Sequence, residues 1–336
     1  MVGARVSCTA ALPTVVRASE PFSCVLSCAL AVAAAGCRAG PSNAPSGVCV
    51  AKLAPDGAAG FDALRAAFVA GNPGYDVAWL PARRELPAAS GDRVVFVQRV
   101  SEPAAQPVAR PVAQPVVQPV AVGDVLLVRA GETWRLDAPG VVDLLAFSLP
   151  TALPDDLPTT VRPDWDPRIT DTPGGCATDD DAYRRILLTW REEVGPYVLH
   201  ALNAHRVRIR DSFTHYHPVD GGFDELYLVQ QAPAGARLVT GDDPAAIEAR
   251  AVDRDGAKAL LTTRPLAAGD LVYLPRGTVH RGLGGALVQV ISVPGFVPDA
   301  EIGVDHHLWA INRRLGLDGD AALPFHLVAA RTAVVK

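Results

Sequence analysis

Two short stretches of the chain carry side chains that could bind one metal ion. The first contains His215 and His217 and is followed by Glu225; the second ends at His280. Alternate residues of a β-strand point to the same face, so His215 and His217 project in one direction, about 7 Å apart. Three imidazoles and one carboxylate suit one divalent transition metal, and this donor set admits Fe, Mn, Ni, Cu, Co or Zn.

The spacing of these residues resembles the two motifs of the cupin superfamily. The first cupin motif reads HxH, a short gap and Glu, and the second reads G-x5-P-x-G-x2-H. The chain matches every fixed position of the second motif, with Gly269, Pro275, Gly277 and His280. The resemblance implies a metal site formed by His215, His217, Glu225 and His280.

The first motif is longer than the family pattern. Seven residues separate His217 from Glu225, which leaves Asp220 and Asp224 as alternative acidic ligands. Glu225 is preferred because it opens the apolar run 225–229, as the Glu of the family opens its strand.

An internal repeat predicts a second domain of the same kind. Segment 224–230 aligns without gaps with 92–98, and 269–281 aligns with 123–135. In this alignment Arg93 replaces Glu225 and Trp134 replaces His280. Arginine stays protonated and the indole only donates, so the N-terminal copy is expected to have lost the metal.

Upstream of the repeat, the same alignment puts Arg83 and Glu85 where His215 and His217 stand. Together with Arg93, these side chains are expected either to form an ion-pair network or to line an anion-binding pocket. The alternative is a structural barrel whose role is to stabilise the other domain.

The predicted fold class is all-β, with two cupin-like jelly-roll β-barrels and a few flanking helices. The 29 Pro and 29 Gly agree, because so many would interrupt a helical bundle. A Pro-rich repeat at 106–121 is predicted to be a surface loop. The expected organisation is a lipoprotein signal peptide at 1–36, a tether at 37–60, a degenerate barrel at 61–150, a linker at 151–180, the metal-binding barrel at 181–300 and a C-terminal tail at 301–336.

Two further expectations concern the start of the metal-binding barrel. An acidic run at 178–181 precedes apolar residues at helical spacing over 183–194, which predicts a helix packed on the barrel or across the domain seam, with Trp190 in the core. Arg206, Arg208 and Arg210 alternate in the opposite phase to the His215–His217 pair and are predicted to lie on the surface.

The N-terminal sequence resembles an export signal. Residues 22–35 are apolar apart from two serines, and they lead to Gly36-Cys37, which resembles the lipobox of bacterial lipoproteins. This predicts a lipid anchor on Cys37 and a periplasmic or membrane-anchored protein; the alternative is a cytoplasmic protein with an alanine-rich leader. Of the six cysteines, only Cys49 and Cys176 are candidates for a disulfide.

The charge of the chain bears on its partners. The net charge is −5 and no basic run is present, so nucleic acid is not expected as a partner, and the membrane is expected only through Cys37. The sequence leaves open whether copies associate into a homo-oligomer.

The function expected from the resemblance is that of a metal-dependent enzyme acting on a small molecule. Dioxygenase chemistry is placed slightly ahead of isomerase or lyase chemistry, and the alternative is a non-catalytic small-molecule-binding bicupin with a structural metal. Tyr227 shares the strand face of Glu225 and is the candidate catalytic proton donor.

Overall fold

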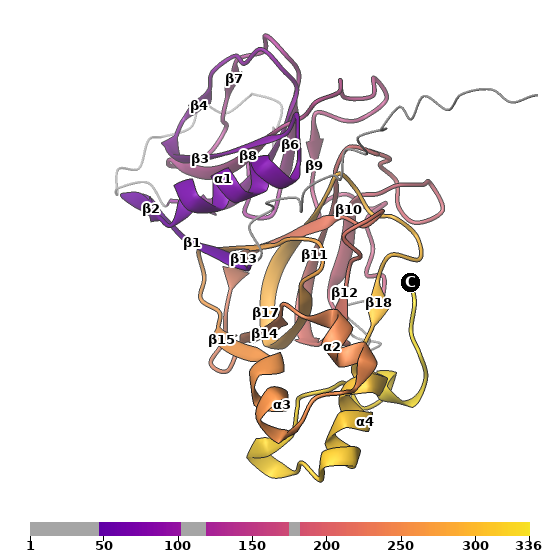
Figure 1. Ribbon diagram of the computed structural model, residues 1–336. Coiled ribbons are helices and arrows are strands. Elements are labelled where there is room, and N and C mark those ends of the chain that lie inside the picture. Colours follow the sequence, from indigo (N-terminus) through magenta and orange to yellow (C-terminus); the bar gives the residue numbers. More distant parts are fainter. Residues whose placement is uncertain (1–46, 102–118, 175–181) are drawn as a thin grey trace, which may run out of the picture. The chain divides into compact units, whose positions relative to one another are not determined.

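The structure is a computed structural model that describes residues 47–101, 119–174 and 182–336 (Figure 1). Antiparallel strands dominate and helices are few, so the predicted all-β class is confirmed. The predicted signal peptide, most of the Pro-rich repeat and Cys176 lie outside the described residues, while Cys49 is a free thiol. Within the described ranges, no helix is long and apolar enough to cross a membrane.

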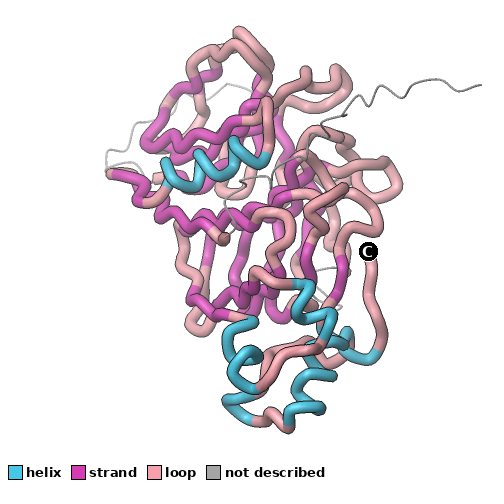
Figure 2. The backbone as a smooth tube through the Cα atoms, viewed as in Figure 1, coloured by secondary structure: helices cyan, strands magenta, loops and turns pink. Residues whose placement is uncertain are grey.

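Figure 1 colours the elements in chain order, and Figure 2 distinguishes helices, strands and loops. The N-terminal half contains β1 (Cys49–Ala54), β2 (Gly57–Ala59), α1 (Phe61–Gly71), β3 (Asp76–Arg83), β4 (Glu85–Leu86), β5 (Arg93–Val100), β6 (Val125–Val128), β7 (Trp134–Arg135), β8 (Val142–Ser148) and β9 (Thr160–Val161). The C-terminal half contains β10 (Arg184–Leu188), β11 (Asn203–Asp211), β12 (His215–Tyr216), β13 (Asp224–Gln231), β14 (Arg237–Gly241), α2 (Pro244–Ala249), α3 (Arg254–Leu260), β15 (Thr262–Pro265), β16 (Asp270–Leu274), β17 (Val279–Val293), β18 (Ile302–Gly303), α4 (Asp305–Leu315) and two short 3₁₀ turns, Gly319–Ala321 and Ala329–Arg331.

The long strand β17 organises the C-terminal half. Its first part pairs with β12 and β14, and its second part pairs with β11 and β13. Gly284 and Gly285 lie between the two parts with φ of 82° and 86°, a conformation that side chains disfavour. One strand thereby joins two antiparallel layers into a jelly-roll barrel, which buries apolar residues such as Val207, Val272 and Val288 inside.

The two halves repeat the same strand pairing. Strand β5 pairs with β6 and β8, as β13 pairs with β16 and β17. Arg93 faces Ser148 across the first pair of strands in the way that Glu225 faces Ser292 across the second. The aligned segments therefore occupy equivalent places in the two halves.

The repeated strands also contact each other reciprocally. The side-chain amide of Gln98 donates to the carbonyl of Val229 at 2.7 Å, and that of Gln230 donates to the carbonyl of Val97 at 3.4 Å. These four residues form two equivalent pairs in the sequence repeat, so the two hydrogen bonds are related by the same approximate symmetry as the strands.

The alignment is wrong upstream of this repeat. In the C-terminal half His215 faces His280, whereas in the N-terminal half it is Leu86 that faces Trp134. Strand pairing therefore equates Leu86, and not Arg83, with His215. The turn that follows is shorter in the N-terminal half than in the C-terminal half.

The expected ion-pair network of the N-terminal half is not formed by the described residues Arg83, Glu85 and Arg93. Arg83 and Glu85 are exposed, while Arg93 is buried. The guanidinium of Arg93 donates a 2.7 Å hydrogen bond to the carbonyl of Pro87 instead.

Part of the predicted tether is a strand. Residues 49–54 form β1, which pairs with β16 in the sheet of the C-terminal half, where Cys49 faces Tyr273. Ala51 and Leu53 are buried and Lys52 is exposed, and this alternation is that of a strand on a core. The sheet of the C-terminal half thus includes chain from both ends of the described sequence.

The predicted helix over 183–194 is also wrong. Residues 184–188 form β10, an edge strand that pairs with β11 and buries Ile186 and Leu187. Backbone hydrogen bonds to β11 outweigh the helical spacing, a common outcome when a short segment can join a sheet.

Of the three arginines predicted on the surface, Arg210 is exposed and Arg208 half-buried, but Arg206 is buried. Its Nε donates to the side chain of Gln230 at 2.6 Å, and its guanidinium forms an ion pair with Asp164. The prediction fails for Arg206 because the N-terminal half covers this part of the strand.

Helix α1 joins the two cores through one aromatic side chain. Phe68 is fully buried and meets the rings of Phe147 and Tyr273 edge to face, with centroids 5.6 and 5.9 Å away. Phe147 belongs to the N-terminal half and Tyr273 to the C-terminal half. Such pairs add to the stabilisation from apolar burial.

We expect Phe68→Ala to lower the free energy of unfolding by about 3–5 kcal/mol, because it leaves a cavity at this aromatic junction. Val69→Ala is the matched control, since Val69 is 37% exposed and should cost about 0.5 kcal/mol or less. Denaturant titration of both variants measures the difference; equal costs would contradict the role given to Phe68.

Candidate metal centre

Four side chains from three strands converge inside the C-terminal barrel. His215 on β12 lies opposite His280 on β17, and His217 follows one residue after β12. Glu225 lies on β13, which pairs with the other part of β17. One ligand atom from each of the four lies within 4.8 Å of the others, and all four side chains are buried. The residues predicted as metal ligands are therefore brought together.

Hydrogen bonds to the backbone orient two of the rings. Nδ1 of His215 lies 3.2 Å from the carbonyl of Phe213, and Nδ1 of His280 lies 3.0 Å from the carbonyl of Thr278. When Nδ1 donates to a carbonyl, the basic lone pair is left on Nε2. Both rings thus present Nε2 as a ligand.

The inward-facing atoms lack the partners that buried polar groups normally have. Within the described residues, Nε2 of all three histidines and Oε2 of Glu225 are buried without a hydrogen bond of good geometry. The one close approach is 3.2 Å, between Nε2 of His280 and Oε2 of Glu225. Buried groups without partners are costly, and a single divalent cation would satisfy all four. These residues fit a divalent transition metal.

The pKa shifts of the candidate ligands bear on whether they can bind a metal. Burial lowers the pKa of His215 well below its ordinary value and that of His217 to about 4, so both are neutral at pH 7. Burial works to raise the pKa of Glu225, but the approach of His280 to 3.2 Å and the neighbouring imidazoles lower it to about 2. Burial works to lower the pKa of His280, but Glu225 raises it above its ordinary value. Neutral imidazoles and an ionised carboxylate are the forms that bind a metal.

Gly277 of the second motif forms a hydrogen bond with the first motif. The backbone N–H of Gly277 donates to the carbonyl of His217 at 2.7 Å. Gly277 has φ of 87°, and a Cβ there would lie 3.0 Å from the side chain of Val219. This contact fixes His217, which lies beyond the end of its strand.

The two alternative acidic ligands are directed elsewhere. Asp220 is exposed on the turn. Asp224 is buried and accepts hydrogen bonds of 2.6–2.9 Å from three side chains and one backbone amide, which belong to Asn72, Tyr273 and Arg276. Glu225 is the acidic residue of the group.

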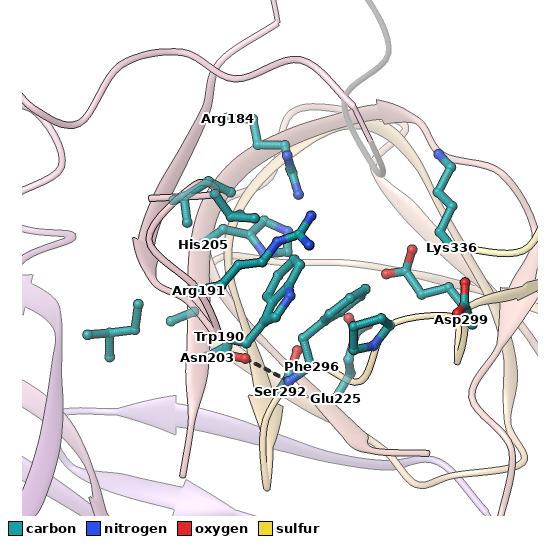
Figure 3. A pocket seen from close by; sticks show the side chains of 16 residues that line it. Arg184, Trp190, Arg191, Asn203, His205, Glu225, Ser292, Phe296, Asp299 and Lys336 are labelled. Atoms are coloured by element: carbon teal, nitrogen blue, oxygen red, sulfur yellow. Dashed lines mark hydrogen bonds between the residues drawn. The ribbon is translucent and has the colours of Figure 1, made fainter. Parts of the chain in front are cut away.

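A cavity of about 390 Å³ opens beside the metal group (Figure 3). Strands β10, β11 and β17 contribute to its wall, and Glu225 is the ligand that reaches it. The other polar and aromatic residues of the lining include Arg184, Trp190, His205, Phe296, Glu301 and Lys336. The volume is within the range of pockets that bind small molecules.

Two titratable residues of this cavity were not found from the sequence. Burial and the nearby Arg184 lower the pKa of His205 to about 3, and burial with the nearby Glu225 raises the pKa of Glu301 to about 7. His205 alternates with Val207 and Ile209, which face the barrel core, so strand periodicity could have identified it. No sequence pattern marks Glu301, which lies just before the two-residue strand β18.

Two aromatic residues have different positions from those expected. Trp190, predicted in the core of a helix, lines the cavity and stacks on Phe296 with ring centroids 4.1 Å apart. Tyr227 is fully buried in the apolar interior of the barrel, 6.2 Å from the ring of His280, and is not part of the cavity lining. Its role as a proton donor stays a prediction.

The strand pairing and the four converging side chains are those expected of a cupin with a candidate metal site. No protein-family model matches the chain, and no curated protein matches it. Among solved structures, the chain is similar to oxalate decarboxylase of Bacillus subtilis, an enzyme with Mn(II) centres, with 13% identity over 74% of each chain and a TM-score of 0.40. The coconut allergen cocosin has 12% identity over 76% of this chain and 88% of its own, also with a TM-score of 0.40.

A protein from Planctomyces limnophilus has 20% identity and a TM-score of 0.29, over 44% of this chain and 96% of its own. Similarities of this extent carry no argument about activity. The cupin assignment rests on the strand pairing and the four converging ligands.

His217→Ala and His280→Ala are each expected to reduce the metal content from about one ion per chain to near zero, because each removes one of four ligands. His306→Ala is the matched control, since His306 lies on α4 outside the group. Elemental analysis of the folded proteins measures the content. Metal retained by both ligand variants would refute the site.

Proposed function

We propose that the protein is a metal-dependent enzyme that acts on a small molecule held in the cavity beside Glu225, and that dioxygenase chemistry is its first candidate reaction. The observation that carries this proposal is the set of three imidazole nitrogens and one carboxylate that are buried, without good hydrogen bonds among the described residues, at the edge of a 390 Å³ cavity.

The donor set leaves coordination positions open. A redox-active ion such as Fe or Mn would supply binding and activation of O₂, or a Lewis acid would polarise a substrate oxygen. The chain holds the ligands through the backbone contacts of His215, His217 and His280, so the site is organised before anything binds. The cavity walls exclude bulk water from Glu225, which is 3% exposed.

Isomerase or lyase chemistry is the second candidate, and a specific observation favours it. Such reactions need a group that takes up and releases a proton near neutral pH. Glu301 lines the cavity with a pKa of about 7, and the neutral imidazole of His205 lies in the same lining. The remaining alternative is a non-catalytic small-molecule binder in which the metal is structural.

The reaction class is tested by loading the full chain with Fe(II) or Mn(II) and screening small organic acids, diols and phenols with an oxygen electrode. We expect substrate-dependent O₂ uptake that His280→Ala abolishes. Turnover without O₂ uptake would select isomerase or lyase chemistry, and binding without turnover would select the binder. Tyr227→Phe tests the predicted proton donor: unchanged turnover would show that Tyr227 only packs.

We also propose that the protein is exported and anchored by a lipid on Cys37, from the lipobox-like sequence that ends at this residue. Mass spectrometry of the protein from its native host should find a mature chain that begins at a diacylated Cys37. A chain that retains Met1 would contradict the anchor and favour the cytoplasmic alternative.

A further inference from the structure

The charges around the cavity favour an anionic ligand. Three basic side chains line it: Arg184, Arg191 and Lys336. Three carboxylates also line it, those of Glu225, Asp299 and Glu301, and they balance the three basic side chains. A divalent cation at Glu225 would add two positive charges. The loaded cavity is therefore positive, which attracts an anion.

Lys336 is held at the cavity by backbone pairing. Its N–H donates to the carbonyl of Glu301 at 3.1 Å, and its carbonyl accepts from the N–H of Glu301 at 2.9 Å. The adjoining strand β18 pairs with β12, where Gly303 faces the metal ligand His215. The backbone of Lys336 is thus bonded to Glu301, next to the strand that pairs with the strand of His215.

The ammonium group of Lys336 lies over an aromatic ring and close enough to Glu301 to oppose the rise in the pKa of that carboxyl. It lies 4.6 Å from the ring centroid of Phe213, which stacks on the ring of His215 at 4.3 Å. No ion pair joins Lys336 to a carboxylate of the described chain. In Figure 3, Lys336 and Arg184 lie above the aromatic pair and Glu225 lies below it.

The opposite wall is apolar and carries polar atoms without partners. Trp190 stacks on Phe296, whose backbone N–H is fixed by a 2.7 Å hydrogen bond to Asn203. Nε1 of Trp190 and Nε2 of His205 are buried without a hydrogen bond among the described residues. Buried polar atoms of this kind are uncommon, and the oxygen of a ligand would satisfy them.

We propose that the cavity binds a small organic carboxylate, with the carboxylate directed to Lys336 and the apolar part against Trp190 and Phe296. This inference deepens the proposed function and rests on it, because it names the substrate class of the same site. The ammonium of Lys336 selects the charge, and the aromatic pair accepts the apolar part of the ligand.

Benzoate and benzamide are suitable probes because they differ in charge and hardly in shape. We expect calorimetric titration of the full chain, loaded with Zn(II), to show that benzoate binds at least about tenfold more tightly than benzamide. Lys336→Gln should remove most of this preference. Lys258→Gln is the matched control, since Lys258 is exposed on α3 and pairs with Asp255, and it should leave the preference unchanged.

Equal binding of the two probes, no binding of benzoate, or a preference that persists in Lys336→Gln would each overturn the inference; the last result would assign the selection to the metal alone. Metal content is measured on the same samples. A chain with one metal that does not prefer benzoate refutes the substrate class only, whereas a chain without metal refutes the proposed function.

Discussion

The burial of four candidate ligand atoms without good hydrogen-bond partners in the described part of the chain is the constraint on which the site depends. Three imidazole nitrogens and one carboxylate oxygen lie within 4.8 Å of one another in the interior of the barrel. Without a cation, the contact of His280 with Glu225 is the one contact among the described residues that offsets their desolvation. Strand β17 makes the arrangement, because its first part carries His280 opposite His215 and its second part pairs with the strand of Glu225.

The sequence repeat helps to explain the hydrogen bonds that support the C-terminal barrel beside Glu225. Asp224 and its repeat partner Asp92 both accept backbone N–H groups from the equivalent turn, from Arg276 and Ala130 respectively. In the C-terminal half Asp224 also accepts from Asn72, at the end of α1. The residue next to the ligand Glu225 is thereby tied to the N-terminal half. We infer that the N-terminal half supports the metal site although the residues aligned with the ligands cannot bind a metal.

The sequence was sufficient to predict that the four candidate ligands converge, because motif spacing and strand periodicity are local properties that survive folding. It was also sufficient for the repeat from Asp92 onward, where no insertion disturbs the register. It failed where tertiary contacts decide: β10 has helical spacing but joins a sheet edge, and β1 pairs with a strand more than 200 residues away. The cavity residues Glu301 and Lys336 come from the C-terminal segment, whose path no local pattern predicts.

The central claim is that the four converging side chains bind one metal ion, and anomalous diffraction from crystals of the loaded protein tests it most directly. Data collected at the absorption edge of the metal should show one strong peak per chain. It should lie about 2.0–2.3 Å from Nε2 of His215, His217 and His280 and from a carboxylate oxygen of Glu225. A peak at other residues, or no peak in protein that contains stoichiometric metal, would contradict the account.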